Sequence, residues 1–73
     1  MKSILINDTI YVLDNHIRRI YKETRGTGAK SNPLCYFIRI EYHGEILAKE
    51  EEIETKEEMD ALLNEIYAII NEK

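Results

Sequence analysis

The chain has 73 residues, 44% of them hydrophobic and 33% charged, and its formal net charge is −4. This length fits one domain over residues 1–73, and the apolar content excludes an intrinsically disordered chain. A single cysteine and the lack of any apolar run of membrane-spanning length exclude a disulfide scaffold and a transmembrane protein, so we expect a cytoplasmic location.

Two β-prone runs in residues 3–13 flank the dipeptide Asn7-Asp8. Asn and Asp tolerate the positive φ angles of a two-residue hairpin turn better than other non-glycine residues do. The sequence therefore predicts a tight hairpin in this region, and Asp14-Asn15 is expected to end its second strand.

Residues 16–24 carry a mixed pattern. Ile17, Ile20 and Tyr21 fall at helical spacing, but the run is too short for an independent helix and is rich in β-branched residues. A strand fits if a β-bulge at Arg18-Arg19 shifts the alternation of the side chains. We therefore favour a strand with a bulge over a short helix.

Residues 25–34 lack hydrophobic periodicity and contain two glycines and a proline, so they predict one long, flexible loop. Its run Gly26-Thr27-Gly28-Ala29-Lys30-Ser31 is superficially similar to a phosphate-binding loop. That motif requires a glycine immediately before the lysine and a helix directly after it, whereas Ala29 precedes Lys30 and Asn32-Pro33 disfavours a helix. A hairpin loop is the better interpretation.

The alternating side chains of residues 35–43 predict the clearest strand, with apolar residues such as Ile38 and Ile40 on one face. Gly44-Glu45 then predicts a turn. Residues 46–53 predict a final strand, which includes an acidic run.

Thr55 and Glu58 form the sequence signature of a capping box, in which the threonine hydroxyl accepts a hydrogen bond from the Glu58 amide. Apolar residues then recur at spacings of three and four, namely Met59, Leu62, Leu63, Ile66, Ile69 and Ile70. This pattern predicts an amphipathic helix over residues 56–71 that buries one stripe against a sheet.

Together these elements predict an α+β fold, an antiparallel β-meander of about five strands in two hairpins, followed by one amphipathic C-terminal helix packed on one sheet face. One helix covers one face, yet the first hairpin and the start of the 35–43 strand are apolar on both faces. Either the sheet curls onto itself, or its second face binds a second copy of the chain or another protein.

Five basic residues cluster in one predicted strand and loop, namely Arg18, Arg19, Lys22, Arg25 and Lys30. Basic side chains beside aromatic ones are typical of sheets that bind single-stranded nucleic acid, and Lys30 among glycines could contact an anion. The alternative is that these charges keep an edge strand soluble. The acidic net charge favours this alternative.

Groups for catalysis or metal binding are sparse. His16 lies apart from the strand that carries Cys35 and His43, and a zinc site needs about four ligands at short spacing. Cys35 and His43 share a strand face, but about 26 Å separates them at about 3.3 Å per residue, so they do not form a nucleophile pair. We therefore expect no enzymatic activity, no metal and no cofactor.

The hairpin over residues 4–13, the break at Asp14-Asn15 and the capped C-terminal helix resemble small uncharacterised sheet-plus-helix proteins of low-GC Gram-positive bacteria and their phages. The resemblance is architectural, and it implies no activity and no site residues. It leaves open that the chain is an inhibitor encoded by a phage or another mobile element.

No motif in the sequence specifies an activity, so function is inferred from surfaces. Residues 1–49 carry eight basic and five acidic side chains, whereas residues 50–73 carry two basic and nine acidic ones. Contact between the basic part of one copy and the acidic helix of another would favour self-association that weakens with salt. We expect a non-enzymatic protein-interaction module, a homodimer, with a nucleic-acid-binding sheet as the alternative.

Overall fold

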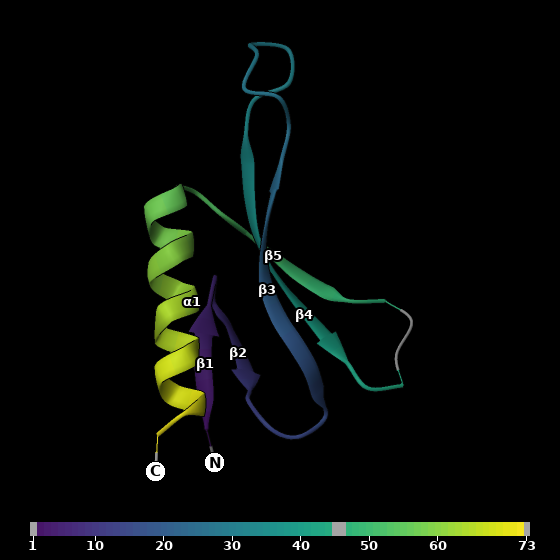
Figure 1. Ribbon diagram of the computed structural model, residues 1–73, viewed down its shortest axis with the longest axis vertical. Helices are drawn as coiled ribbons and strands as arrows, with labels where there is room; N and C mark the ends of the chain where they lie inside the picture. Colours follow the sequence, from purple (N-terminus) through teal and green to yellow (C-terminus); the bar gives the residue numbers. More distant parts are fainter. Residues whose placement is uncertain (1, 45–46, 73) are drawn as a thin grey trace.

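The computed structural model describes residues 2–44 and 47–72. The predicted α+β class is confirmed, because antiparallel strands precede one helix that packs against them (Figure 1). In chain order the elements are β1 (Ser3–Ile6), β2 (Thr9–Val12), β3 (Ile17–Arg25), β4 (Cys35–Tyr42), β5 (Lys49–Ile53) and α1 (Lys56–Ile70). Within the described residues, no helix has the length and apolar character needed to cross a membrane.

The strands divide between two sheets. β1 pairs with β2, and a separate sheet has the order β3-β4-β5. The chain turns between the sheets at Asp14, whose side chain accepts a hydrogen bond from the backbone amide of His16 at 2.9 Å. This turn matches the break predicted at Asp14-Asn15.

The hairpin turn predicted at Asn7-Asp8 is confirmed. Asn7 has a φ of 47° and Asp8 a φ of 67°. Positive φ at both central residues is the geometry of a type I′ turn, whose twist matches that of the flanking strands. The turn sets the register in which Ile4 lies opposite Tyr11 and Leu5 opposite Ile10.

β3 is a strand, as predicted, and its register with β4 shifts near Arg18. Ile17 lies opposite Tyr42, whereas Arg19 lies opposite Glu41, so Arg18 is the extra residue. The bulge explains the mixed spacing of apolar residues in the sequence, because it allows both Ile17 and Ile20 to face α1.

β3 and β4 extend beyond the rest of the sheet as a two-stranded arm along the 43 Å long axis of the molecule (Figure 1). The predicted loop forms the tip of this arm and begins one residue later than expected, because Arg25 belongs to β3. Gly26 has a φ of 99°, and a Cβ atom there would lie 2.2 Å from the carbonyl oxygen of Pro33. Only glycine fits this position.

The last strand is shorter than the predicted range of 46–53, because β5 begins at Lys49. Pairing with β4 ends where Lys49 meets Ile40, and before that point the chain bends and exposes Leu47. Positions 45 and 46, and with them part of the predicted Gly44-Glu45 turn, lie outside the described residues.

The predicted helix is confirmed as α1, which ends at Ile70 and has Asn71 as its C-cap. The Thr55 hydroxyl accepts a hydrogen bond from the Glu58 amide at 3.2 Å, as the capping box predicts. Met59 and Ile66 are fully buried, so the apolar stripe faces the sheet.

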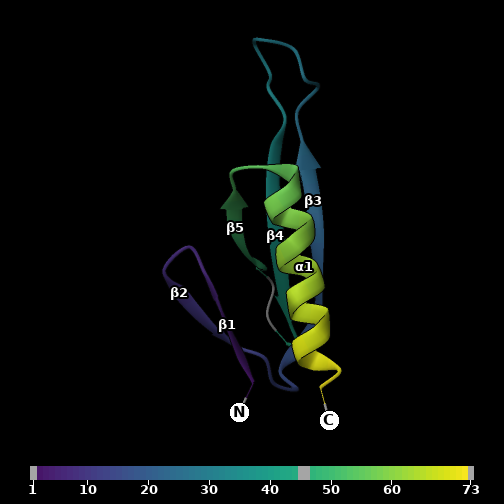
Figure 2. The ribbon, with the colours of Figure 1, turned by 90° about the vertical axis from the view of Figure 1, so that its left-hand side faces the viewer.

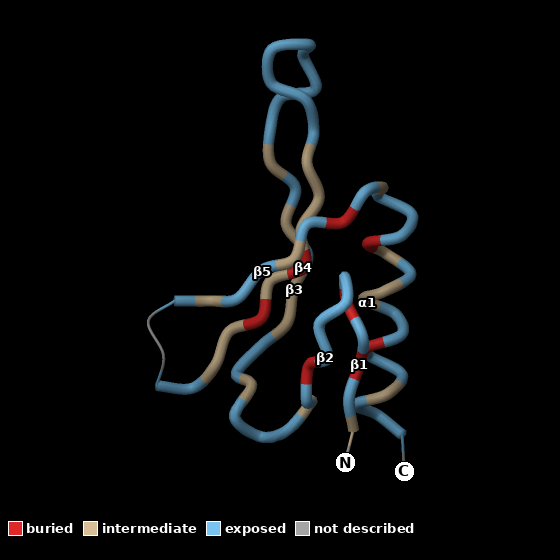
Figure 3. The backbone as a smooth tube through the Cα atoms, turned by 180° about the vertical axis from the view of Figure 1, so that it is seen from behind, coloured by how far each residue is buried: buried red, intermediate tan, exposed pale blue. Residues whose placement is uncertain are grey.

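The core lies between the three-stranded sheet and a second layer made of α1 and the β1–β2 hairpin. Figure 2 shows α1 in front of β3 and β4, with the hairpin beside it. Figure 3 marks the buried positions in red along β1, β2, β4, β5 and α1, and they are Ile4, Ile6, Tyr11, Ile38, Ile40, Ile53, Met59 and Ile66. The helix and the hairpin lie on one side of the three-stranded sheet (Figure 1), and the opposite face, here called the open face, has no covering layer in the described residues.

Candidate interaction surface

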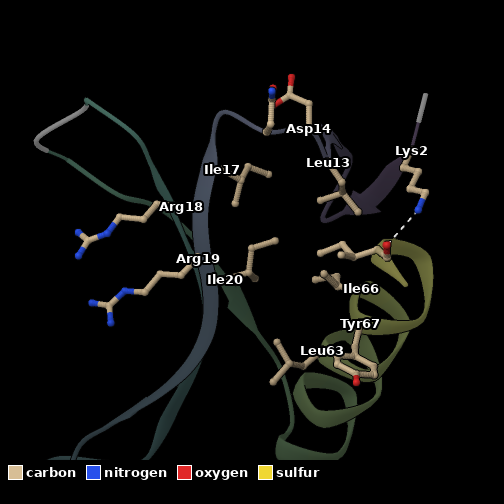
Figure 4. A pocket seen from close by; sticks show the side chains of 12 residues that line it. Lys2, Leu13, Asp14, Ile17, Arg18, Arg19, Ile20, Leu63, Ile66 and Tyr67 are labelled. Atoms are coloured by element: carbon tan, nitrogen blue, oxygen red, sulfur yellow. Dashed lines mark hydrogen bonds between the residues drawn. The ribbon is translucent and has the colours of Figure 1, made fainter. Parts of the chain in front are cut away.

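An open groove of about 600 Å³ separates the C-terminal half of α1 from the start of β3, and we call it the α1–β3 groove. Ile17 and Ile20 line it from β3, and Leu63, Ile66 and Tyr67 line it from α1 (Figure 4). Arg18 and Arg19 point away from it in the same view. The floor and both walls of the groove are therefore mainly apolar.

Lys2 closes one end of the groove and caps the helix. Its ammonium group donates to the carbonyl oxygens of Ile70 at 2.9 Å and Glu72 at 2.7 Å. α1 carries no basic residue in its own last turn. A cation from the start of the chain thus interacts with the negative end of the helix dipole.

The rim of the groove exposes two large apolar side chains. Tyr67 is 71% exposed and Ile70 is 48% exposed. They follow Leu63 at spacings of four and three, so they extend the buried helix stripe onto the side of α1 that borders β3. A continuous apolar surface of this kind favours contact with another molecule.

The backbone of β3 is unpaired along the edge next to this groove. Within residues 2–44 and 47–72, β3 pairs with β4 and no strand lies along its other edge. Such an edge presents backbone N–H and C=O groups that can pair with a further strand.

A second apolar patch lies on the outer face of the β1–β2 hairpin. Leu5 is 61% exposed, Ile10 directly opposite is 69% exposed, and Val12 is 38% exposed. This patch confirms that the hairpin is apolar on both faces. The expected curling is only partial, because the hairpin buries its inner face against the core and leaves this outer face exposed.

The open face of the three-stranded sheet combines arginines with aromatic rings. The Arg19 guanidinium lies 4.6 Å from the centre of the Tyr21 ring, and that of Arg25 lies 4.2 Å from the Phe37 ring. These distances allow cation–π attraction. The aromatic faces that would stack on nucleotide bases are therefore covered by side chains of the protein itself.

The arginines of the open face also pair with carboxylates. Arg19 donates to Glu41 at 2.6 Å and 3.1 Å, and this contact holds the pKa of Glu41 below its usual range. Arg25 donates to Glu23 at 2.8 Å and to Glu50 at 2.5 Å, and it lowers the pKa of Glu23 in the same way. Positive and negative charges thus alternate on this face.

The predicted basic cluster does not form one patch. Arg18 lies 3.8 Å from Glu41, and Arg19 and Arg25 make the pairs described above. Lys22 points to the other face of the sheet, where it bonds to Asp60 of α1 at 2.9 Å. Lys30 is exposed in the loop at the tip of the arm.

The sequence did not predict the α1–β3 groove. The residues that line the groove include Lys2 and residues of β3 and α1, so the groove forms only when α1 packs against the sheet. One sequence signal points to it, because Tyr67 and Ile70 widen the helix stripe beyond what one sheet face can bury. Within the described residues, no cluster of His, Cys, Asp and Glu is arranged to hold a metal ion.

Comparisons with known protein families, with curated proteins and with solved structures found no match. The resemblance to small proteins of low-GC Gram-positive bacteria and their phages therefore stays a prediction. The groove, the β3 edge and the open face are the surfaces from which a function can be inferred.

Proposed function

We propose that the protein is a small non-enzymatic interaction module that binds another polypeptide along the α1–β3 groove. The observation that carries this proposal is the exposure of Tyr67 and Ile70 directly beside the unpaired edge of β3. An extended polypeptide can pair its backbone with such an edge and place apolar side chains in the groove. An inhibitor from a mobile element would be one form of this activity.

The reducing interior of a cell suits this proposal. Cys35 is a free, half-buried thiol, and the chain contains no second cysteine with which to form an internal disulfide. We therefore place the protein in the cytoplasm, where thiols remain reduced.

The nucleic-acid alternative draws on the arginines and rings of the open face. Binding there would require Arg19 and Arg25 to release Glu41, Glu23 and Glu50, and it would bring a polyanion next to those carboxylates. The cost of breaking these ion pairs favours the α1–β3 groove over the open face as the binding site. Titration with single-stranded oligonucleotides at low salt separates the two alternatives, with the backbone amide resonances of these arginines as the readout. Resonance shifts confined to the open face would favour nucleic-acid binding.

A selection of peptides from a random library tests the proposal. Peptides retained by the native protein are measured against a Tyr67→Gln variant, which removes the exposed ring from the groove while keeping a good helix former. Ile10→Ser is the matched control, because it removes an exposed apolar side chain from the hairpin instead. We expect Tyr67→Gln to weaken peptide binding about tenfold and Ile10→Ser to leave it unchanged.

Two outcomes would contradict the proposal. Either the native protein is a monomer that retains no peptide, or the retained peptides bind the native protein and the Tyr67→Gln variant equally well. Peptides that depend on Ile10 would move the interaction site to the outer face of the hairpin.

A further inference from the structure

We infer that the polypeptide that occupies the α1–β3 groove is a second copy of this chain, whose β3 pairs antiparallel with the first β3 about a two-fold axis at Tyr21. This inference rests on the proposed function and names the partner. A two-fold axis joins the same edge of both copies, so a single surface is sufficient for both sides of the interface.

The antiparallel pairing makes one continuous sheet to which each copy contributes β3, β4 and β5. A two-fold axis perpendicular to the sheet keeps both open faces on one side and both α1 helices on the other. Since α1 lies over β3 and β4, the two helices come to lie next to each other across the axis (Figure 2). Their groove-facing residues Leu63 and Tyr67 then meet the second helix instead of water.

Charge complementarity selects the register. In the register centred on Tyr21, Arg19 of each copy lies directly opposite Glu23 of the second copy, so opposite charges face each other on both sides of the axis. Centred on Ile20, Arg19 would face Tyr21. Centred on Lys22, two lysines would face each other and Arg19 would face Arg25.

The same register extends the alternation of charges on the open face. Within one copy, Glu23 bonds to Arg25 and Arg39, and Arg19 bonds to Glu41. Across the axis, Glu23 gains Arg19 of the second copy as a neighbour on the same face. The bulge at Arg18 ends the regular backbone, and the paired segment therefore runs from residue 19 to residue 23, with Tyr21 at its centre.

The solution mass is the first test, measured by light scattering behind a sizing column at low and high salt. We expect a dimer whose dissociation constant rises with salt, because the Arg19–Glu23 pairs are exposed to solvent. Tyr67→Gln should raise that constant about tenfold, and the Ile10→Ser control should not change it. A monomer at all salt concentrations, or equal effects of the two substitutions, would overturn the inference.

A cysteine placed on the axis tests the register. In a Cys35→Ser background, Tyr21→Cys puts two thiols opposite each other, where strand geometry gives Cα atoms about 4.5–5.5 Å apart, within reach of a disulfide. The control Thr24→Cys places its two thiols about 20 Å apart, from six residues at about 3.3 Å each. We expect oxidation to give a covalent dimer with Tyr21→Cys and none with Thr24→Cys.

The outcomes separate this inference from the proposed function. A covalent dimer through Thr24→Cys but not Tyr21→Cys would overturn the register. A monomer that binds selected peptides through Tyr67 would contradict the proposal that the partner is a second copy, but it would support the proposed peptide-binding function. A monomer without such peptides would overturn both. If Tyr21→Cys does not fold, the solution masses of the native protein and of Tyr67→Gln still show whether the chain forms a dimer through the groove.

Discussion

At the scale of single residues, Tyr11 and Asn7 fasten the hairpin to β5. Tyr11 is 6% exposed, and its hydroxyl donates to the carboxylate of Glu51. The side-chain amide of Asn7 donates to the carbonyl oxygen of Glu52 at 2.6 Å. These bonds explain why a hairpin that shares no strand pairing with the larger sheet still has a fixed position.

Tyr11 makes the stability of the protein sensitive to alkaline pH. Burial, followed by the bond to Glu51, raises the pKa of Tyr11 above its ordinary value of 10.0. Below that value the phenol keeps its proton in both the folded and the unfolded state. As the pH rises further, the unfolded state loses the proton first, so the free energy of unfolding falls.

We therefore expect Tyr11→Phe to reduce the loss of unfolding free energy between about pH 9 and about pH 11, compared with the native protein. The free energy of unfolding at each pH is measured by urea titration, with circular dichroism as the signal because the chain has no tryptophan for fluorescence. Tyr36→Phe is the control, because it removes a phenol hydroxyl from a half-buried residue of β4 that does not line the α1–β3 groove. Equal alkaline losses in the native protein and in Tyr11→Phe would show that Tyr11 does not cause the effect.

At the scale of elements, the sequence predicts what neighbouring residues determine. The turn depends on Asn7 and Asp8 alone, and the helix start depends on Thr55 and its hydrogen bond three residues ahead. Contacts between distant elements were not predictable in this way. Lys22 bonds to Asp60, 38 residues later, and Tyr11 bonds to Glu51, 40 residues later. The local sequence pattern therefore predicts neither hydrogen-bond partner.

The same distinction explains why the predicted basic residues do not form one patch. These residues follow one another in the sequence, but a strand sends Arg19 and Lys22 to opposite faces, and each meets an acid from another element. The groove was missed for the related reason that α1 and β3 form it together.

The N-cap of α1 should contribute measurably to stability. We expect Thr55→Ala to lower the free energy of unfolding by about 1 kcal/mol, because the Glu58 amide loses its acceptor. Thr55→Ser keeps the hydroxyl and should stay close to the native value. Urea unfolding of the three proteins provides the comparison, and an equal loss in the serine variant would assign the effect to packing of the threonine methyl group.

At the scale of the whole molecule, one small core holds two sheets and a helix together. Each element supplies only a few buried residues, such as Ile6 from β1, Ile38 and Ile40 from β4 and Met59 from α1. Domains of this size have a small margin of stability, so the loss of one such side chain affects the whole fold.

Two isoleucines on opposite faces of the hairpin test this dependence. Ile6 is 1% exposed and Ile10 is 69% exposed. We expect Ile6→Ala to lower the free energy of unfolding by about 2–5 kcal/mol and Ile10→Ala to change it by less than about 0.5 kcal/mol. Circular dichroism during thermal and urea unfolding at one protein concentration checks both values. Similar losses would mean that the outer face of the hairpin is also covered.

The bond between Lys2 and the end of α1 places the first and last described residues of the chain side by side (Figure 1). A short linker could therefore join the two ends, and new termini could be opened in the exposed tip of the arm without cutting a strand. In such a circular permutant the helix precedes the hairpin directly. The helix–hairpin contacts then become local in sequence, and the β3–β4 pairing becomes distant. The entropic cost of loop closure therefore falls for the helix–hairpin contacts and rises for the β3–β4 pairing.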